Sequence, residues 1–228
     1  MVSDETMLFS NRVEAGRRLA TSLKGLVGKD VVVLAVPRGG VVVGFEVAHA
    51  LSGPLDVIIP RKIGAPNNSE LAIGAMTEDG TIILDDKLVR YLQVSKDYVR
   101  EESERQRLEI ERRLRLYRGD APYPSLSNRE VIIVDDGVAT GSTMKAAVAS
   151  VRKRGAKIVV IAVPVGPAST IQELKKDADN VVCLHTPEPF YSIGQFYEDF
   201  TQTSDEEVAE LLKHNRQALN VARRQRNK

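Results

Sequence analysis

Short apolar runs rich in β-branched residues recur along the chain and are separated by amphipathic or charged stretches. Runs of this length are typical of strands in a parallel sheet that is covered on both faces. They predict strands over 31–36, 55–59, 131–134, 158–163 and 181–184, and a hairpin from 71–76 and 81–84. Helices are predicted over 11–28, 41–52, 95–118 and 204–222, and from about residues 142 and 169. Strands that alternate with helices predict an α/β fold with a mainly parallel, twisted sheet flanked by helices.

The first predicted helix carries signals for both of its ends. Asn11, with Glu14 three residues later, matches a capping box at the start of a helix. Leu23 and Leu26 continue the helical spacing, and Gly28 is expected to end the helix. These signals predict an N-terminal helix ahead of the first buried strand.

The longest predicted helix, residues 95–118, is dominated by charge. Glutamate precedes arginine at i,i+4 in three pairs: Glu101 with Arg105, Glu109 with Arg113, and Glu111 with Arg115. Because the glutamates neutralise the arginines, a solvated helix is favoured over a nucleic-acid surface. Its thin apolar seam consists of Val99, Ile110, Leu114 and Tyr117. We expect this helix to be an insertion, residues 61–70 to be a loop rich in Gly, Pro and Asn, and the basic end after residue 222 to be frayed.

Composition and charge narrow the functional classes. The 228 residues, 43% of them apolar, suit one α/β domain over residues 1–228 with an ordinary core. A net charge of +1, from 32 basic and 31 acidic residues, provides no field that favours nucleic acid or membrane. The single cysteine, Cys183, fits a reducing compartment. We see no signal peptide and no apolar run long enough to span a bilayer, so we expect a cytoplasmic protein.

The most specific chemistry lies in residues 131–143, VIIVDDGVATGST, where an apolar strand ends at two adjacent carboxylates, Asp135 and Asp136. Ligands of parallel sheets bind beyond the carboxyl ends of the strands. The helix that starts near Ser142 offers free N–H groups and a positive dipole end, which suit a phosphate. Gly137 and Gly141 let backbone amides approach the phosphate closely.

The two aspartates must contact a different group, because carboxylates do not bind phosphate oxygens. The 2′- and 3′-hydroxyls of a ribose are adjacent donors that match adjacent carboxylate acceptors. Hydroxyls near the helix start add donors for the phosphate: Thr140, Ser142 and Thr143. The stretch therefore predicts a site for ribose 5-phosphate.

Three other interpretations of this stretch are less favoured. A Walker A loop is disfavoured, because the spacing from Gly137 is one residue short and no lysine precedes the hydroxyl. An acidic metal pocket, with Asp135 or Asp136 as a phospho-acceptor, leaves the residues ATGST unexplained. A helix cap explains one aspartate and one serine but not the whole string.

At this point the sequence resembles the type I phosphoribosyltransferases. Residues 131–143 resemble the family's phosphoribosyl pyrophosphate motif, and VPRGGVVVG (36–44) resembles its pyrophosphate loop. RKIGAPNNSE, from Arg61, resembles the start of the mobile loop that closes over the active site. The layout is most similar to an uncharacterised branch of the family. The resemblance covers a core of about 30–170, and it implies a small hood from about 1–28 and 180–203.

The resemblance implies Mg²⁺-dependent transfer of a 5-phosphoribosyl group to a nitrogenous base, a purine or pyrimidine, with release of pyrophosphate. It implies catalytic roles for Asp135, Asp136, Arg38 and Lys62. It also implies substrate contacts from Pro37, Gly39, Gly40, Arg61, Gly137, Val138, Ala139, Thr140, Gly141, Ser142 and Thr143, and a cis Pro37–Arg38 peptide. We expect Mg²⁺ to be held mainly by the substrate, with Asp135 or Asp136 as its protein ligand. A homodimer is also expected.

Three points stay open at the level of sequence. Arg38 has an alternative explanation as a surface residue of a glycine turn, and Arg61 and Lys62 have one as ordinary loop charges. Gly64, Ala65 and Pro66 stand where relatives carry another basic residue, which weakens the expected catalytic contribution of the loop. The aromatic-rich segment 185–200 is either a stacking platform for the acceptor or packing for the hood. A sensor of phosphoribosyl pyrophosphate or a nucleotide, without transferase activity, is the alternative function.

Overall fold

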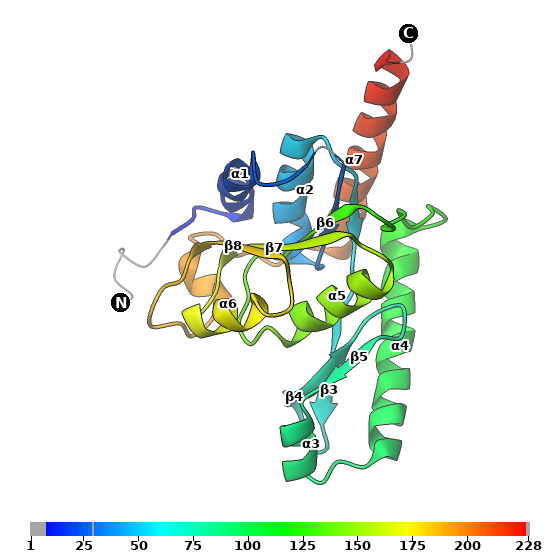
Figure 1. The fold of residues 1–228 in the computed structure, drawn as a ribbon, viewed down its shortest axis with the longest axis vertical. Helices are drawn as coiled ribbons and strands as arrows, with labels where there is room; N and C mark the ends of the chain where they lie inside the picture. Colours follow the sequence, from blue (N-terminus) through cyan, green and yellow to red (C-terminus); the bar gives the residue numbers. More distant parts are fainter. Residues whose placement is uncertain (1–7, 29, 227–228) are drawn as a thin grey trace.

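A five-stranded sheet forms the centre of the computed structural model, which describes residues 8–28 and 30–226 (Figure 1). All neighbouring strands in it are parallel, in the order β2–β1–β6–β7–β8. The strands are β1 (Val31–Ala35), β2 (Leu55–Val57), β6 (Glu130–Val134), β7 (Ile158–Val165) and β8 (Asn180–His185). The prediction of a mainly parallel α/β fold is therefore confirmed.

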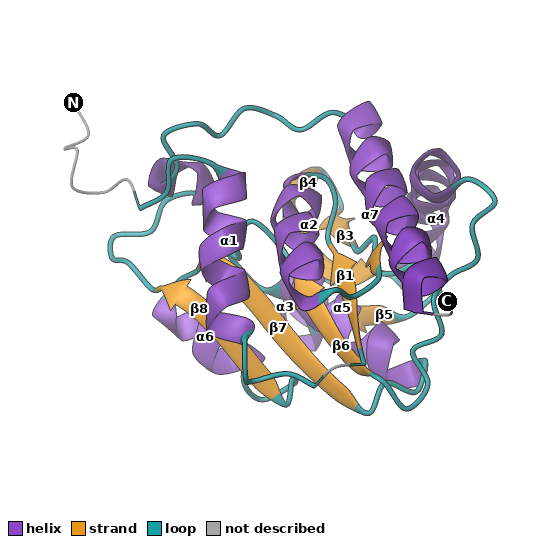
Figure 2. Cartoon of the chain, turned by 90° about the horizontal axis from the view of Figure 1, so that it is seen from above, coloured by secondary structure: helices purple, strands orange, loops and turns teal. Residues whose placement is uncertain are grey.

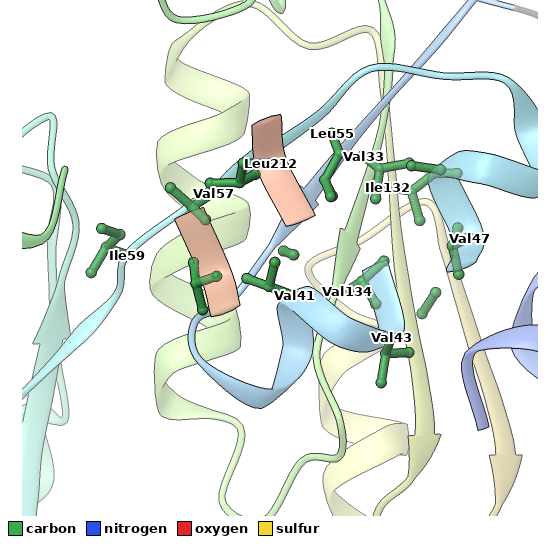
Figure 3. Close-up of a cluster of buried hydrophobic side chains, with 14 of the residues drawn as sticks. Val33, Val41, Val43, Val47, Leu55, Val57, Ile59, Ile132, Val134 and Leu212 are labelled. Atoms are coloured by element: carbon green, nitrogen blue, oxygen red, sulfur yellow. The ribbon is translucent and has the colours of Figure 1, made fainter. Parts of the chain in front are cut away.

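Helices cover both faces of this sheet, which explains why its strands are apolar on both sides (Figure 2). The helices of the chain are α1 (Arg12–Leu23), α2 (Gly39–Leu51), α3 (Asp86–Tyr91), α4 (Lys96–Arg118), α5 (Ser142–Lys153), α6 (Ala168–Leu174) and α7 (Asp205–Arg226), with a 3-10 turn η2 (Ile193–Phe196). Val33 and Ile132 belong to the cluster that packs against α2 and α7, which Figure 3 shows together with Val41 and Leu212. Leu34 belongs to the cluster on the opposite face, under α5 and α6.

A second, three-stranded antiparallel sheet consists of β3 (Arg61–Ala65), β4 (Asn68–Met76) and β5 (Ile82–Leu84). We refer to this sheet and α3 as the flap; α4 packs against it and against α7. The prediction of a loop over 61–70 is wrong, because Pro66 and Asn67 form only the turn of a hairpin. Asn67 adopts a left-handed backbone with φ 63°, so the turn signals mark a reversal of the chain and not a long loop.

Helix boundaries differ from the predicted ones in four places. Helix α1 ends at Leu23 and not at Gly28, because Gly25 takes φ 84° and turns the chain away. Helix α2 already starts at Gly39. Helix α3 was not predicted, although Asp85 caps it by accepting hydrogen bonds from the backbone N–H groups of residues 87 and 88. Helix α7 continues to Arg226 through most of the basic end that was expected to fray, and residues 227–228 lie outside the described part.

The long helix α4 matches the predicted bounds, with Ser95 as its N-cap. Its predicted apolar seam is confirmed, since Ile110 and Tyr117 are buried. Of the predicted charge pairs, Glu109 with Arg113 is formed at 2.7 Å, whereas Arg105 pairs with a different residue, Glu102.

We call α1 together with residues 186–204 the hood. The two parts join around a small apolar cluster that includes Phe9, Phe196 and Tyr197. The N-terminal part of the expected hood, residues 1–7, lies outside the described residues. No helix within residues 8–28 and 30–226 is long and apolar enough to cross a bilayer.

Candidate functional site

The candidate site lies where the strand order of the main sheet reverses. From β1 the chain passes through α2 to β2 on one side, whereas β6 pairs with β1 on the other side. The segments that leave β1 and β6 start side by side, because the Val36 N–H donates to the Val134 carbonyl at 2.8 Å. In open parallel sheets such a switch point is the usual place for a ligand.

The two predicted motifs meet at this point. A β-carbon placed on Gly39 would lie 2.0 Å from Asp136 Oδ2, and one placed on Gly40 would lie 2.8 Å from Asp135 Oδ1. Only glycine therefore allows the start of α2 to approach both carboxylates. The Pro37–Arg38 peptide just before it is cis, as the resemblance implied.

Asp136 is held by two side chains of the hood. Its Oδ2 lies 2.7 Å from Arg12 Nε, and its backbone carbonyl accepts a hydrogen bond of 2.6 Å from Tyr197 Oη. Arg12 also donates to the Thr201 carbonyl at 2.8 Å and stacks on the Phe200 ring, 3.8 Å from its centroid. The ion pair is buried, with exposed side-chain fractions of 10% for Arg12 and 12% for Asp136.

Asp135 has a different environment. Its Oδ1 accepts one hydrogen bond of 2.8 Å, from the Asp136 backbone N–H. Burial, and then the negative charge of Asp136, raise the pKa of Asp135 well above its usual range. A carboxyl group of this kind is poised to gain a hydroxyl donor or a cation, since either would stabilise its ionised form.

The predicted phosphate loop follows the two aspartates and ends at α5. Gly141 caps the helix with φ 78°, and Ala139 and Thr140 are exposed. The loop is fixed from behind, because Thr170 Oγ1 donates to the Ala139 carbonyl at 2.6 Å. A β-carbon on Gly137 would lie 2.6 Å from Ile193 of the hood, so this glycine is required for packing as well. The start of α5 therefore presents its positive dipole end next to the exposed residues Ala139 and Thr140, an arrangement that suits an anion.

A cavity of about 420 Å³ lies between the site and the flap. Its lining brings together four predicted residues, Pro37, Arg61, Lys62 and Thr143, with Val36, Pro60, Gly64, Ser69, Glu102 and Gln106. Arg61 Nε donates to Gln106 Oε1 of α4 at 2.9 Å. Burial, followed by the charge of Arg113, lowers the pKa of Arg61 from its ordinary high value. Two cations and a hydroxyl around one cavity suit an anion with several oxygens.

A second cavity, of about 300 Å³, lies beside the phosphate loop. Thr140, Ser142 and Lys145 line it from the loop and α5, and the flap closes the other side with Gly74 and Asp85. Lys145 was not among the predicted site residues. It lies one turn after the start of α5, and its Nζ is 3.8 Å from Glu173 Oε2.

The Arg38 side chain contacts the start of α7 and lies outside both cavities. Its Nη1 lies 3.8 Å from Asp205 Oδ1 at the start of α7, and Tyr117 Oη donates to the same oxygen. The side chain is 31% exposed and does not line either cavity beside the flap. The structure therefore separates Arg38 from Arg61 and Lys62.

Two rings of the aromatic segment of the hood serve packing, and another ring is exposed. Phe196 and Tyr197 are only 1% and 3% exposed, and Tyr191 is 84% exposed. The packing interpretation is confirmed for Phe196 and Tyr197, and a stacking platform from these two rings is excluded. Within the described ranges, no three His, Cys, Asp or Glu side chains gather as metal ligands would.

Sequence reasoning missed three residues that the fold brings to the site: Arg12, Gln106 and Lys145. A signal for Arg12 was present, because it shares the helical spacing of Gly16, Leu19 and Leu23, the buried face of α1. A charged residue on a buried face needs a partner. No comparable signal marks Gln106 on a helix that is polar nearly all round.

The fold, the switch-point site and its two loops define a phosphoribosyltransferase-like α/β protein. The family model described as "Phosphoribosyl transferase domain" matches residues 6–201. The chain therefore belongs to the type I phosphoribosyltransferase family.

Two relatives support this assignment. The chain is 47% identical over 205 residues to "Putative phosphoribosyl transferase Rv0571c" of Mycobacterium tuberculosis. The alignment covers 90% of the chain and 46% of that protein, so the chain spans about half the length of this curated relative. The chain is also similar to TT1426 from Thermus thermophilus, whose crystal structure matches with a TM-score of 0.79. The sequence identity is 42%, and the match covers 91% of the chain and 99% of TT1426.

Proposed function

We propose that this protein binds phosphoribosyl pyrophosphate at the β1–β6 switch point and transfers its 5-phosphoribosyl group to a nitrogenous base. The observation that carries the proposal is the contact between the two loops: Gly39 and Gly40 pack directly on Asp136 and Asp135. Two segments far apart in the sequence thereby meet beside the start of α5. The acceptor, a purine or pyrimidine, and a homodimeric state are part of the proposal.

The ribose ring is proposed to lie over the ends of β1 and β6. Its hydroxyls face the aspartates, and its 5-phosphate is bound by the loop from Ala139 to Thr143. The exposure of Ala139 and Thr140 supports this placement, together with the positive end of the α5 dipole. Lys145, in the cavity beside the loop, provides a countercharge for the same phosphate.

The pyrophosphate is proposed to occupy the cavity that Arg61, Lys62 and Thr143 line. In the reaction the bond from C1 of the ribose to the pyrophosphate oxygen breaks, and that oxygen keeps the electron pair. A ring nitrogen of the acceptor forms the new bond to C1 and loses its proton to solvent. Arg61 and Lys62 stabilise the negative charge on the leaving group, and the aspartates lie near the positive charge on the sugar.

Mg²⁺ is the proposed cofactor. Carboxylate oxygens are the ligands it prefers, and Asp135 fits this requirement because, among the described residues, no cation pairs with its carboxyl. Asp136 fits it less well, since Arg12 already occupies Oδ2. The remaining ligands would come from the substrate and water. When bound, the ion would neutralise part of the pyrophosphate charge.

Titration calorimetry with phosphoribosyl pyrophosphate and Mg²⁺ tests the proposal. We expect wild-type protein to bind, and Asp135→Asn combined with Asp136→Asn to weaken binding by at least about thirtyfold, because hydrogen bonds to charged groups are lost. Asp86→Asn, an exposed aspartate of the flap, serves as the matched control and should leave binding unchanged.

A screen for pyrophosphate release over purine and pyrimidine bases then separates enzyme from sensor. Release with one class of base establishes the transferase and its acceptor. Binding without release over all bases favours the sensor function. If the double variant binds as tightly as wild type, the assignment of the aspartates is wrong.

A further inference from the structure

Arg12 is a buried cation of the hood that contacts the candidate site. Its side chain is 10% exposed, and its Nε lies 2.7 Å from Asp136 Oδ2. The residues are separated by 124 positions in the sequence. The proposed phosphoribosyl transfer assigns no role to Arg12.

Stability alone is a poor explanation for this pair. Removing two charges from water costs several kcal/mol per ion, about as much as their attraction returns, so apolar residues would serve the fold equally well. The pair is also in a special place. A β-carbon on Gly39 would lie 2.5 Å from Arg12 Nε and 2.0 Å from Asp136 Oδ2, so the ion pair is packed directly on the start of α2.

The hood holds Asp136 from more than one side. Tyr197 Oη donates to its carbonyl, and Arg12, which binds its carboxylate, is itself held by the Thr201 carbonyl and the Phe200 ring. The position of Asp136 therefore depends on whether α1 and residues 197–201 are docked. Asp135 differs, because within the described part of the chain its carboxylate accepts only the Asp136 backbone N–H.

We propose that Arg12 is a positioning residue that fastens Asp136 to the hood and leaves Asp135 as the carboxylate that accepts the ribose hydroxyls. The two neighbouring acids thus have unequal roles. Asp136 joins the docking of the hood to the sugar site, and Asp135 contacts the sugar. The inference rests on the proposed function, since it assumes that the site takes phosphoribosyl pyrophosphate.

Calorimetric binding of phosphoribosyl pyrophosphate with Mg²⁺ to single and double variants tests the inference. Asp135→Asn should weaken binding by at least about thirtyfold, the loss expected for hydrogen bonds to a charged group. Asp136→Asn and Arg12→Gln should each weaken it less than about tenfold. Because the two residues act as a pair, the double variant should bind no more weakly than either single variant.

Hydrogen exchange gives a second readout. In wild-type protein the backbone amides of 197–201 should gain protection when the ligand binds, and in Arg12→Gln this gain should be lost. Arg17→Gln is the matched control on the same helix, since Arg17 is 70% exposed and pairs with Glu46 at the surface. It should keep both the affinity and the gain in protection.

Multiplicative losses for Arg12→Gln and Asp136→Asn would overturn the inference, and so would an Asp136→Asn variant as weak as Asp135→Asn. If Arg12→Gln does not fold, the comparison of Asp135→Asn with Asp136→Asn decides. A wild-type protein that does not bind overturns the proposed function instead. In that case, hydrogen exchange in the free protein still tests whether Arg12 holds the hood against Asp136. The backbone amides of 197–201 should exchange faster in Arg12→Gln and at the wild-type rate in Arg17→Gln.

Discussion

The hood and the flap lie against the same site and both pack through buried apolar side chains, but their polar contacts differ in burial. The hood is attached through an apolar cluster and the buried Arg12–Asp136 pair. The flap is attached to α4 partly through polar contacts, such as Tyr98 Oη to the Gly64 carbonyl at 3.0 Å and Arg61 to Gln106. Most ion pairs of α4 are exposed, so water and salt screen them.

This comparison shows that the distance between two charged groups does not by itself determine how much their pair stabilises the fold. Arg12 and Arg107 both lie within 2.7 Å of a carboxylate, yet their side chains are 10% and 43% exposed. Removing one partner of a buried ion pair leaves the other charge buried and uncompensated. When one partner of an exposed pair is removed, water solvates the remaining charge. The buried Arg12–Asp136 pair of the hood is therefore expected to contribute more to stability than the exposed pairs of α4.

The largest effect is expected for Arg12→Ala. It should lower the free energy of unfolding by about 3–5 kcal/mol, because Asp136 is left buried without its partner. Arg107→Ala should lower it by no more than about 1 kcal/mol. Urea unfolding measures both values, and equal losses would show that burial does not distinguish the two ion pairs.

Gly39→Ala should have the next largest effect. The new methyl group would overlap the Asp136 carboxylate, and overpacking of this kind costs about 1–3 kcal/mol. Gly28→Ala is the control, because its nearest neighbour is the end of the Glu130 side chain, 3.1 Å away, which can move. Thermal unfolding should separate the two variants, and matching melting temperatures would show that the site adapts.

Two tyrosine variants give a matched comparison of smaller size. Tyr197→Phe leaves the buried Asp136 carbonyl without its donor and should cost about 1–3 kcal/mol. Tyr98→Phe removes a partly buried hydrogen bond to the flap and should cost about 0.5–1.5 kcal/mol. Hydrogen exchange should increase around the hood in the first variant and around β3 in the second. A change in the same region in both variants would contradict the comparison.

The smallest predicted effect is the loss of a stabilising ion pair of α4 at acidic pH. Hydrogen bonds from Arg112, and then from Arg113, lower the pKa of Glu109 to about 2. A lowered pKa in the folded state means that its contribution is fully present above the ordinary pKa near 4.5 and is lost as the pH falls toward 2. Because Glu109 and Arg113 are still 28% and 21% exposed, water screens the pair, and Glu109→Gln should cost less than about 1 kcal/mol at pH 7 and almost nothing near pH 2. Urea midpoints at the two pH values measure this, and a loss that persists at pH 2 would exclude the ion pairs as its cause.

Local patterns predicted the elements that carry the chemistry. The apolar runs predicted each strand of the main sheet, and the run that ends at Asp135 and Asp136 placed both acids just after β6. Predictions of secondary structure failed where one local signal was compatible with two structures. Pro66 and Asn67 suggested a loop but form a hairpin turn, and Gly25 ended α1 before the expected Gly28.

By itself, the sequence determined the α/β class and the two loops, because periodicity, glycine placement and turn chemistry act between near neighbours. The tertiary structure decided which of the two adjacent acids is paired, and it brought Gln106 to Arg61 and Arg12 to Asp136. Such contacts join residues far apart in the chain. They depend on how helices cross the sheet, which no local spacing records.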